Sequence, residues 1–293
     1  GPSANFRHPS CQKQLTKGLC VNRKCLAPTP CPALKVDHSE YLSILRHLRE
    51  LPGVKHVFVR SGLRYDYMML EKDDRFMREL LQYHVSGQLK VAPEHCSANV
   101  LDYMGKPHIS VYEQFAERFY RLTKQVGKEQ YLVPYLMSSH PGSTLRDAVN
   151  LAVFLKKNRI RPEQVQDFYP TPGTISTCMF YTGLDPYTLK EVYVPRSQED
   201  KWLQRSLLQY FKPENRRAVM MALKKAGREN LIGTDPNCLI APDRNQRQRQ
   251  AFSSQKDKKP QRNGGRMRER NDFSAGKPKT GKNSRYSKLK RHY

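Results

Sequence analysis

Long apolar segments are absent from this chain of 293 residues, since no run of 18 or more apolar residues occurs. The sequence therefore predicts no membrane-spanning helix. Its first residues contain no basic region followed by an apolar run, so we expect no secretory signal there and a cytoplasmic location. Phosphate-binding loops of the types G-x-x-x-x-G-K-[ST] and G-x-G-x-x-G are also absent, which leaves nucleotide binding through those loops unsupported.

Acidic residues are scarce, with 27 Asp and Glu against 52 Lys and Arg, and the net charge is +25. The excess is densest in residues 241–293, which contain 17 Lys or Arg and 4 Asp or Glu. Because this segment has few aliphatic residues, we predict a disordered basic tail. Such a tail attracts RNA by releasing phosphate counterions, although a solvated tail that only improves solubility has the same composition.

Four short β-branched or apolar runs alternate with segments of helical periodicity between residues 39 and 183. Strand, helix and strand at spacings of roughly 35 residues predict parallel strands joined by right-handed crossovers. We therefore expect an α/β fold, in which the strands belong to an open doubly wound sheet or to part of a barrel. The predicted strands are residues 54–60, 87–93, 130–137 and 164–170.

Helical features lie within and beyond this region. Thr144 and Asp147 have the spacing of a capping box, which predicts a helix beginning just after Pro141-Gly142. After the last predicted strand, apolar residues recur only at helical spacing. Residues 184–240 are therefore predicted to form a small helical cap that serves packing.

Polar residues follow each predicted strand at its carboxyl end. Open α/β sheets and TIM barrels both place their active sites in the loops at that end, so we expect a site there. His95 and His140 lie beside acidic or hydroxyl groups, a setting for general acid–base chemistry, although such residues more often only form hydrogen bonds. The other polar stretches are Arg60-Ser61, Arg64-Tyr65-Asp66, Glu94, Ser138-Ser139 and Tyr169 to Gly173.

Four of the seven cysteines lie close together, in residues 1–38. Cys11, Cys20, Cys25 and Cys31 are separated by 8, 4 and 5 residues. In a reducing compartment such a group more often binds metal than forms disulfides. The spacing is looser than that of paired C-x2-C zinc sites, so zinc is compatible with it but not implied by it. We expect a metal or cluster site here, with unliganded thiols as the alternative.

Longer motifs carry a further signal from Gly1 to about Pro242. They are GPSAN, VRSGLRYD, LKVAPEH, LDYMGKP, GKEQYLVPYLMSSHPGST, VQDFYPTPGTISTCMFYTG and LIGTDPNCLI, together with the four cysteines. These motifs resemble the carboxyl-terminal portion of the YgiQ-type radical S-adenosylmethionine proteins. The resemblance implies a partial or full TIM-like barrel in which a 4Fe-4S cluster cleaves S-adenosylmethionine to a 5′-deoxyadenosyl radical, which acts on an unidentified substrate.

One departure from this family pattern concerns the cluster ligands. The family holds its cluster with C-x3-C-x2-C, and no such triplet occurs in this chain. We therefore expect a fragment that begins after two strands and the cluster loop, with the missing amino-terminal half of the barrel as its partner. In that setting the four cysteines would hold an auxiliary iron–sulfur cluster or zinc.

The resemblance also implies residues that bind S-adenosylmethionine. Gly1, Pro2 and Ser3 would lie near its methionine end. The remaining positions come from strand ends, and they are Arg60, Ser61, Lys90, Glu94, Ser138, His140, Pro172 and Gly173. An ion pair between Lys90 and Glu94 is the alternative for those two, because side chains at even spacing share a strand face. No catalytic residue is identified.

Two other functions remain open at this stage. One is a non-catalytic RNA-binding module that uses the barrel mouth and the basic tail. The other is a structural fragment stabilised by zinc at the four cysteines.

Overall fold

The computed structural model describes residues 9–18, 20–21 and 23–242. The chain divides into two units, residues 1–243 and 244–293. The predicted disordered tail therefore lies almost entirely outside the described residues, as do Gly1, Pro2 and Ser3. Within the described part, no helix is both long and apolar enough to cross a bilayer.

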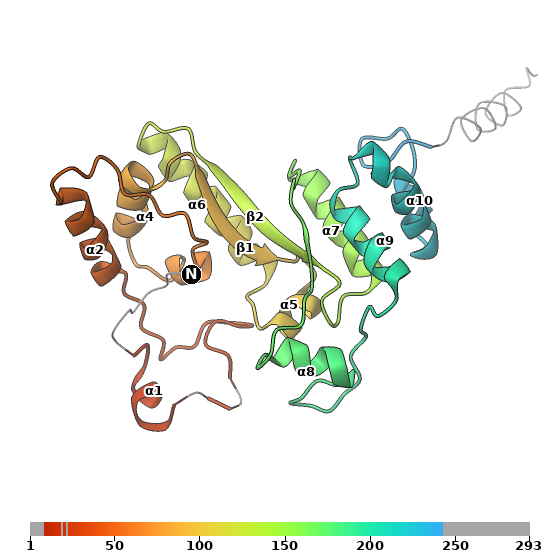
Figure 1. The fold of residues 1–293 in the computed structure, drawn as a ribbon, viewed down its shortest axis with the longest axis horizontal. Coiled ribbons are helices and arrows are strands. Elements are labelled where there is room, and N and C mark those ends of the chain that lie inside the picture. The colour runs from red at the N-terminus through yellow and green to blue at the C-terminus, as the bar shows by residue number, and fades with distance from the viewer. Residues whose placement is uncertain (1–8, 19, 22, 243–293) are drawn as a thin grey trace, which may run out of the picture. The chain divides into compact units, whose positions relative to one another are not determined.

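Three parallel strands form a sheet in the order β1-β2-β3. Figure 1 shows the two longer strands, β1 and β2, side by side. Strands β1 (Gln88–Glu94) and β2 (Tyr131–Ser138) pair along most of their length, whereas β3 (Gln166–Asp167) pairs only with the last two residues of β2. A helix lies in each crossover, as parallel connections require. The predicted α/β class with parallel strands is thus confirmed, and the sheet of the described residues is small and open.

Helices follow the predicted periodic segments closely. The capping box is confirmed, because the Thr144 hydroxyl accepts from the Asp147 amide at 3.3 Å while the Asp147 carboxylate accepts from the Thr144 amide at 3.0 Å. The α-helices are α1 (Gln12–Lys17), α2 (Ser39–Glu50), α3 (Tyr65–Met68), α4 (Arg75–Glu79), α5 (Ala98–Met104), α6 (Ile109–Gln125), α7 (Leu145–Lys157), α8 (Ile175–Thr182), α9 (Gln198–Leu208) and α10 (Arg216–Lys225). A π-helical turn spans Leu80–His84, and 3-10 turns span Pro213–Asn215 and Glu229–Leu231.

The pattern at residues 54–60 predicts a strand, and this prediction is wrong. The segment lies beside the end of the π-helical turn, where the Val59 amide donates to the His84 carbonyl at 2.9 Å and the His84 Nδ1 donates to the Val57 carbonyl at 2.8 Å. These contacts use one amide and one carbonyl that could otherwise form part of a strand ladder. Only Leu63, beyond the segment, forms a parallel bridge to Val91 of β1.

The last strand, β3, is shorter than the strand predicted at residues 164–170. Within residues 164–170 only the two residues of β3 pair with β2. Pro162 and Pro170 lie on either side of β3. Proline has no amide hydrogen to donate, so neither residue can extend the ladder.

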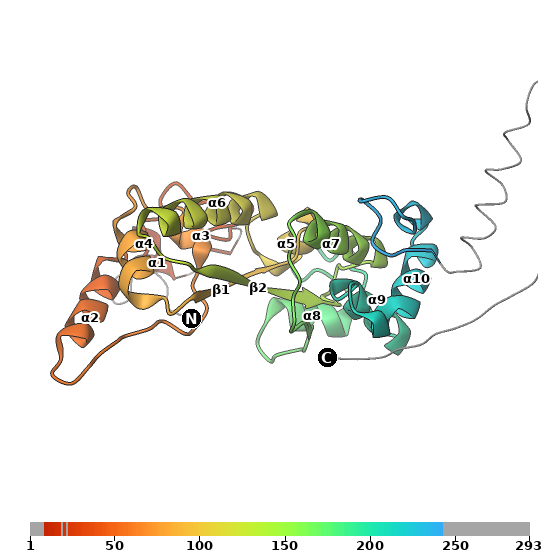
Figure 2. The same cartoon turned by 90° about the horizontal axis from the view of Figure 1, so that it is seen from above.

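Two hydrophobic clusters pack against the sheet. The first surrounds Phe115 and Phe119 of α6 and includes side chains of α2, α4 and β1. The second surrounds Leu151 and Leu155 of α7 and includes side chains of α9 and α10. Helices α6 and α7 lie on the same side of β1 and β2 (Figure 2). The predicted helical cap therefore contributes to the core, since α9 and α10 bury their apolar faces against α7.

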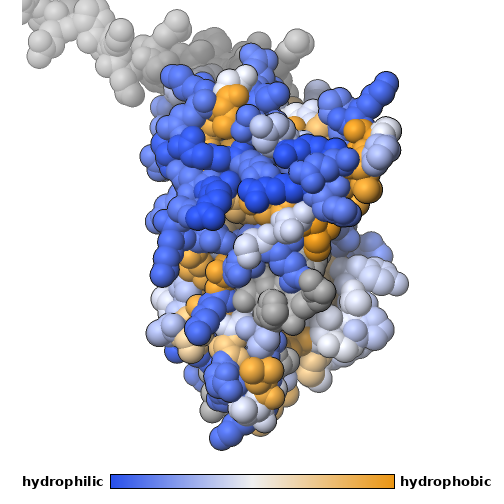
Figure 3. All heavy atoms as spheres, turned by 90° about the vertical axis from the view of Figure 1, so that its left-hand side faces the viewer, coloured by the Kyte–Doolittle hydropathy of each residue, from blue (hydrophilic) through white to orange (hydrophobic). Residues whose placement is uncertain are grey.

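The outer side of the first cluster is largely hydrophilic. Helix α2 buries Tyr41, Leu42 and Leu45 but leaves Ile44 and Leu48 partly exposed. Figure 3 shows this side of the molecule, where apolar patches are separated by hydrophilic side chains. The alternating burial of β1, with Leu89 and Val91 inside, is consistent with one covered and one open sheet face.

Candidate functional site

Strands β1 and β2 end in the same unusual way. Glu94 and Ser139 have φ values of 66° and 63°, in the left-handed region that non-glycine residues rarely adopt. Each is followed by a buried histidine, His95 or His140. Because the strands are parallel neighbours, their carboxyl ends lie side by side at the same end of the sheet. A left-handed non-glycine residue costs on the order of 1–3 kcal/mol, so the surrounding structure must hold it in place.

His140 is held by hydrogen bonds at both ring nitrogens. Its Nδ1 donates to the Pro141 carbonyl at 2.7 Å, and its Nε2 accepts from the Ser176 hydroxyl at 2.8 Å, near the start of α8. Burial lowers the pKa of His140 to about 4. The ring is therefore neutral at pH 7 and has no free nitrogen, which favours the hydrogen-bonded interpretation over acid–base chemistry.

His95 is equally enclosed. Its Nδ1 accepts from the Ser97 amide at 3.0 Å, so the neutral ring carries its proton on Nε2. Burial lowers the pKa of His95 to about 4, opposed by the Asp147 carboxylate and assisted by the charge of a protonated His140. His140 therefore lies close enough to His95 for its charge to disfavour protonation of His95.

Polar side chains of β3 and α9 also form hydrogen bonds at the strand ends. Together with the two histidines they form what we call the strand-end layer, which consists of His95, Ser138, His140, Asp167, Gln204 and Arg205. The Ser138 hydroxyl donates to the Asp167 carboxylate of β3, which also pairs with Arg205 of α9 at 2.9 Å. Gln204 of α9 is fully buried and accepts from the Ser139 amide at 3.2 Å. Asp167, Gln204 and Arg205 were not predicted from the sequence, because no local pattern shows that α9 reaches the strand ends.

Gln204 also bonds Ser143, and the glycine before Ser143 packs closely against a ring of α5. Its Oε1 accepts from the Ser143 hydroxyl at 3.0 Å and its Nε2 donates to the Ser143 carbonyl at 2.8 Å. Gly142, just before, has a φ of 90° and lies against the Tyr103 ring of α5, where a Cβ atom would overlap that ring. Glycine is therefore required at this turn for both space and backbone conformation.

The alternative pairing of Lys90 with Glu94 does not form. Glu94 instead pairs with Lys106, whose Nζ lies 3.3 Å from the carboxylate and donates to the Ala92 carbonyl at 2.8 Å. Lys90 lies over the Tyr135 ring, 5.9 Å from its centroid. Lys106, which sequence reasoning also missed, thus holds the strained end of β1.

The other predicted residues lie on flanking loops. Arg60 and Ser61 are exposed and precede the Leu63 bridge, which places them beside β1. Pro172 and Gly173 are exposed in the turn that leads into α8. The described structure therefore brings Glu94, Ser138 and His140 to the carboxyl ends of neighbouring strands, while these four residues lie in exposed loops before Leu63 and before α8.

Cys11, Cys20, Cys25 and Cys31 form no disulfide bonds. All four thiols are free, with Cys25 exposed and the other three partly buried. Burial raises the pKa of Cys25, and the charges of Cys11, Cys31 and Cys20 raise it further. No group of three or more Cys, His, Asp or Glu side chains is arranged to hold a metal ion within residues 9–18, 20–21 and 23–242.

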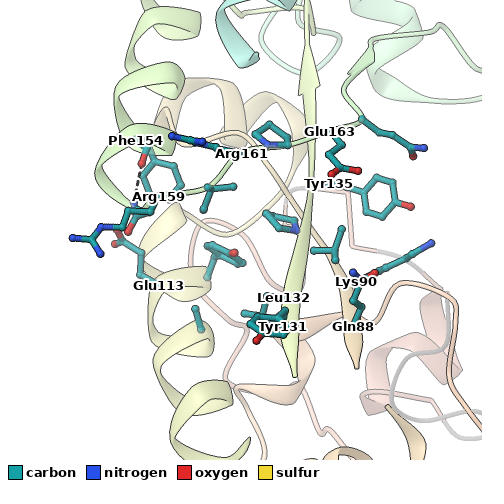
Figure 4. A pocket seen from close by; sticks show the side chains of 18 of the residues that line it. Gln88, Lys90, Glu113, Tyr131, Leu132, Tyr135, Phe154, Arg159, Arg161 and Glu163 are labelled. Carbon is teal, nitrogen blue, oxygen red and sulfur yellow. Dashed lines mark hydrogen bonds between the residues drawn. The ribbon is translucent and has the colours of Figure 1, made fainter. Parts of the chain in front are cut away.

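A cavity of about 740 Å³ lies apart from the strand ends, along the edge of β2 that β3 does not reach (Figure 4). Of the predicted site residues that the structure describes, only Lys90 lines it. Pro134 removes a donor from this edge, and the Leu132 amide donates to the Tyr120 hydroxyl at 3.5 Å. These features protect the strand edge from pairing with another strand.

Comparisons with known proteins place this geometry in context. Residues 163–292 match a family described as "Domain of unknown function (DUF3362)". The chain is 53% identical over 291 residues to a UPF0313 protein of Clostridium perfringens (strain 13 / Type A), which covers 99% of this chain and 43% of the relative. It is also 55% identical over 240 residues to a UPF0313 protein of Clostridium botulinum (strain 657 / Type Ba4). That match covers 82% of this chain and 38% of the relative. The homologues of this chain are UPF0313 proteins.

The UPF0313 similarity covers both candidate regions. The Clostridium perfringens match extends over nearly the whole chain, so it includes the cysteine group as well as the strand ends. The chain spans less than half the length of these UPF0313 relatives. Any activity of a whole UPF0313 protein is therefore only proposed for this chain.

Proposed function

We propose that this chain is the carboxyl-terminal part of a radical S-adenosylmethionine enzyme, with a partial TIM-like barrel whose β1 and β2 ends contact the cofactor. The observation that carries the proposal is the repeated strand end, in which a strained residue precedes a buried histidine at Glu94 and Ser139. Strained backbone concentrates at functional sites, and parallel strands place such sites at their carboxyl ends. The resemblance carried by the long motifs supports S-adenosylmethionine as the cofactor.

The chain's own groups suit the polar ends of S-adenosylmethionine. Glu94 offers a carboxylate to the methionine ammonium, and the exposed Arg60 offers a guanidinium to its carboxylate. Lys106 orients Glu94, while Gln204 and Asp167 hold the end of β2. We assign binding and orienting roles to these residues. Acid–base chemistry is not assigned to His140, because both nitrogens of its neutral ring are already hydrogen-bonded.

The residues present do not fit the cluster that cleaves S-adenosylmethionine. That cluster needs three thiolates at C-x3-C-x2-C spacing, and this chain has none. We assign the cluster to the part of the UPF0313 relatives that lies outside this chain, and no reaction step is attributed to the residues described above.

A chimaera tests the proposal. The region of the Clostridium perfringens relative that this chain does not cover would be joined to it and purified anaerobically with iron and sulfide. We expect 5′-deoxyadenosine upon reduction with S-adenosylmethionine. A chimaera with a full complement of iron and sulfide that forms none contradicts the proposal.

Glu94→Gln in that chimaera tests the binding residue. We expect the Kd of S-adenosylhomocysteine to rise roughly tenfold by calorimetry, which corresponds to about 1.4 kcal/mol. Glu229→Gln, an exposed change away from the strand ends, is the matched control and should leave the Kd unchanged. Equal affinity in both variants would remove Glu94 from the site.

RNA binding at the same edge is a second candidate. Tyr169 and Tyr181 are 76% and 68% exposed beside α8, and exposed aromatic rings can stack on unpaired bases. We expect single-stranded RNA to bind with strong salt dependence, and to bind more weakly after Tyr169→Ala or after removal of residues 241–293. Fluorescence anisotropy measures both effects, and unchanged binding in both variants argues against this function.

A further inference from the structure

A second cavity, of about 680 Å³, lies at the opposite end of β1 and β2 from the strand-end layer. Residues 85–87 and 126–130, which directly precede the two strands, form part of its wall. Residues 55–58 and Arg49 of α2 form other parts. Its volume is within the range of about 300–1,000 Å³ that is usual for small-ligand sites. The cavity is therefore separate from the site proposed above for S-adenosylmethionine.

Irregular backbone forms much of the cavity wall. Gln82 and Tyr83 belong to the π-helical turn Leu80–His84, and both line the cavity. Such turns are rare and are frequently found at functional sites. Residues 55–58 lie in the segment that forms no strand. Neither segment is thus committed to a regular helix or sheet at this place.

Two residues of the wall have a buried polar atom without a hydrogen-bond partner in the described part of the chain. Gln130 is 5% exposed, and its Nε2 donates to the Leu81 and Val85 carbonyls at 2.8 and 2.9 Å, whereas its Oε1 is unpaired. The Nη1 atom of Arg49 is also unpaired, although the guanidinium lies 4.1 Å from the centroid of the Tyr83 ring. Unpaired buried groups cost free energy, so a ligand that brings both an acceptor and a donor is favoured.

Positive charge predominates around the cavity. Among the described residues that line it, Arg49, Lys55 and Lys128 are basic and Glu129 alone is acidic. Arg49 lies 4.0 Å from the carboxylate of Glu79. Lys55 and Lys128 are exposed, and neither forms an ion pair within residues 9–18, 20–21 and 23–242. An anionic group is therefore the acceptor that suits this wall.

Aromatic rings lie in the same wall. Phe58 and Tyr83 are 43% and 42% exposed. The His56 ring stacks on Phe58 with a centroid distance of 5.3 Å, and the Arg49 guanidinium lies over Tyr83. Exposed aromatic faces stack readily on the flat rings of nucleic-acid bases. The wall thus combines a stacking surface with positive charge.

We propose that this cavity binds one nucleotide, with its phosphate at Arg49, Lys55 and Lys128 and its base on Phe58 or Tyr83. The phosphate oxygens accept from Arg49, and the hydroxyl or amino groups of the nucleotide donate to Gln130. Because the unpaired atoms of Arg49 and Gln130 are covered, these two side chains rotate when the ligand binds. A free nucleotide and the phosphorylated end of an RNA offer the same chemistry.

Calorimetry on the full chain tests the ligand class. The four ribonucleoside 5′-monophosphates are titrated in turn, followed by inorganic phosphate and adenosine. We expect at least one nucleotide to bind once per chain, with a Kd about tenfold below those of inorganic phosphate and adenosine. Nucleotides that bind no more tightly than inorganic phosphate overturn the proposal.

Competition separates this cavity from the proposed cofactor site. S-adenosylhomocysteine carries an adenine ring but no phosphate, so it should not displace the bound nucleotide. Displacement would show that the nucleotide occupies the cofactor site instead, which overturns the proposal. Neither readout depends on cleavage of S-adenosylmethionine, so this inference and the proposed function can fail independently.

Substitutions of exposed lysines test the phosphate contacts. Lys55→Gln and Lys128→Gln should each raise the Kd of the nucleotide about threefold, and together about tenfold, because exposed charges contribute modestly and additively. Lys157→Gln changes an exposed lysine of α7, which does not line the cavity, and should leave the Kd unchanged. The same loss in Lys157→Gln as in the double variant contradicts the placement of the phosphate.

A ring substitution tests the stacking surface. Phe58→Leu should raise the Kd of the nucleotide about fivefold and leave that of inorganic phosphate unchanged. Tyr187→Leu changes a tyrosine that is 57% exposed outside the cavity, so it is the matched control. If Phe58→Leu and the same change at Tyr83 both leave the Kd of the nucleotide unaltered, the base does not bind at these rings and the proposal is overturned.

Lysine acylation tests the site in the unaltered chain, where no variant can misfold. At a nucleotide concentration of about ten times its Kd, acylation of Lys55 and Lys128 should slow roughly tenfold, and that of Lys157 should not change. Mass spectrometry of the peptides measures each rate. Equal slowing at all three lysines, or at none, overturns the proposal. Stronger protection by a 5′-phosphorylated RNA pentamer than by the free nucleotide identifies an RNA end as the source of the phosphate.

Discussion

The strand-end layer and the cysteine segment hold reactive groups in opposite ways. At the strand ends, His95, His140 and Gln204 of α9 are buried and hydrogen-bonded. In residues 9–38 the thiols are partly exposed, and the contacts that connect them are mainly backbone hydrogen bonds. Packing against a hydrophobic core therefore positions the polar groups at the strand ends, whereas the four thiols lie in a segment that has few buried side chains.

Core truncation should separate the two regions most strongly. Phe119→Ala removes a fully buried ring from the first cluster and should lower the free energy of unfolding by about 3–5 kcal/mol. Leu15→Ala changes a side chain of α1 that is 62% exposed, so the expected change is within about 0.5 kcal/mol. Urea unfolding measures both. A large effect of Leu15→Ala would show a core in the cysteine segment.

Acidification should affect the strand-end layer next most strongly. The folded-state pKa values of His95 and His140 are about 4, below the ordinary value of 6.5, so folding favours the neutral rings. Their contribution is fully present above about pH 6.5 and is lost as the pH falls from there to about 4. A shift of this size corresponds to about 3 kcal/mol for each ring.

Urea unfolding at pH 7 and pH 4.5 measures this dependence. His95→Gln should reduce the difference in unfolding free energy between the two pH values by up to about 3 kcal/mol. His47→Gln, on the outer part of α2, is the control and should leave the difference as it is. Equal pH dependence in His95→Gln and the unaltered chain would contradict the burial of a neutral ring.

Gln204→Leu should have a smaller effect, confined to hydrogen bonding. Leucine has a similar size but leaves the Ser139 amide and the Ser143 hydroxyl without their partner. The expected loss of unfolding free energy is about 1–3 kcal/mol. Gln198→Leu, at the exposed start of the same helix, should cost less than about 0.5 kcal/mol. Similar losses in both variants would mean that Gln204 does not hold the end of β2.

Removal of a helix cap should have the smallest effect. Thr144→Ala deletes the cap of α7 and should cost about 1 kcal/mol, whereas Thr144→Ser should retain most of the stability. Helix α1, in the cysteine segment, begins at Cys11 without a side-chain cap. We expect a cap to contribute measurably to stability only where the helix packs on a core. Thermal unfolding of Thr144→Ala and Thr144→Ser measures this contribution for α7. Identical melting temperatures would contradict this expectation.

Much of the fold was accessible from local patterns. Helices α2, α6 and α7 lie within the predicted helical segments of residues 39–183, and α9 and α10 lie within the predicted cap of residues 184–240. Strands β1 and β2 lie within one residue of their predicted bounds. Shorter elements such as α3, α5 and α8 were not predicted, because four to eight residues give too little periodicity.

The candidate site was only partly accessible. Parallel topology alone placed Glu94, Ser138 and His140 at one edge, as observed. The left-handed backbone at Glu94 and Ser139 had no local signal, since neither residue is glycine. The roles of Gly1, Pro2 and Ser3 remain predictions, because these residues lie outside the described structure.

The sequence by itself determined the α/β class, the main helices, the capped start of α7 and the edge at which polar residues gather. These features follow from periodicity and caps, which act over a few residues. Only the tertiary structure decided that residues 54–60 form no strand, that Glu94 pairs with Lys106, and that Gln204 reaches Ser139. Such contacts join residues far apart in the chain, and packing around the two clusters selects among the many partners that local chemistry permits.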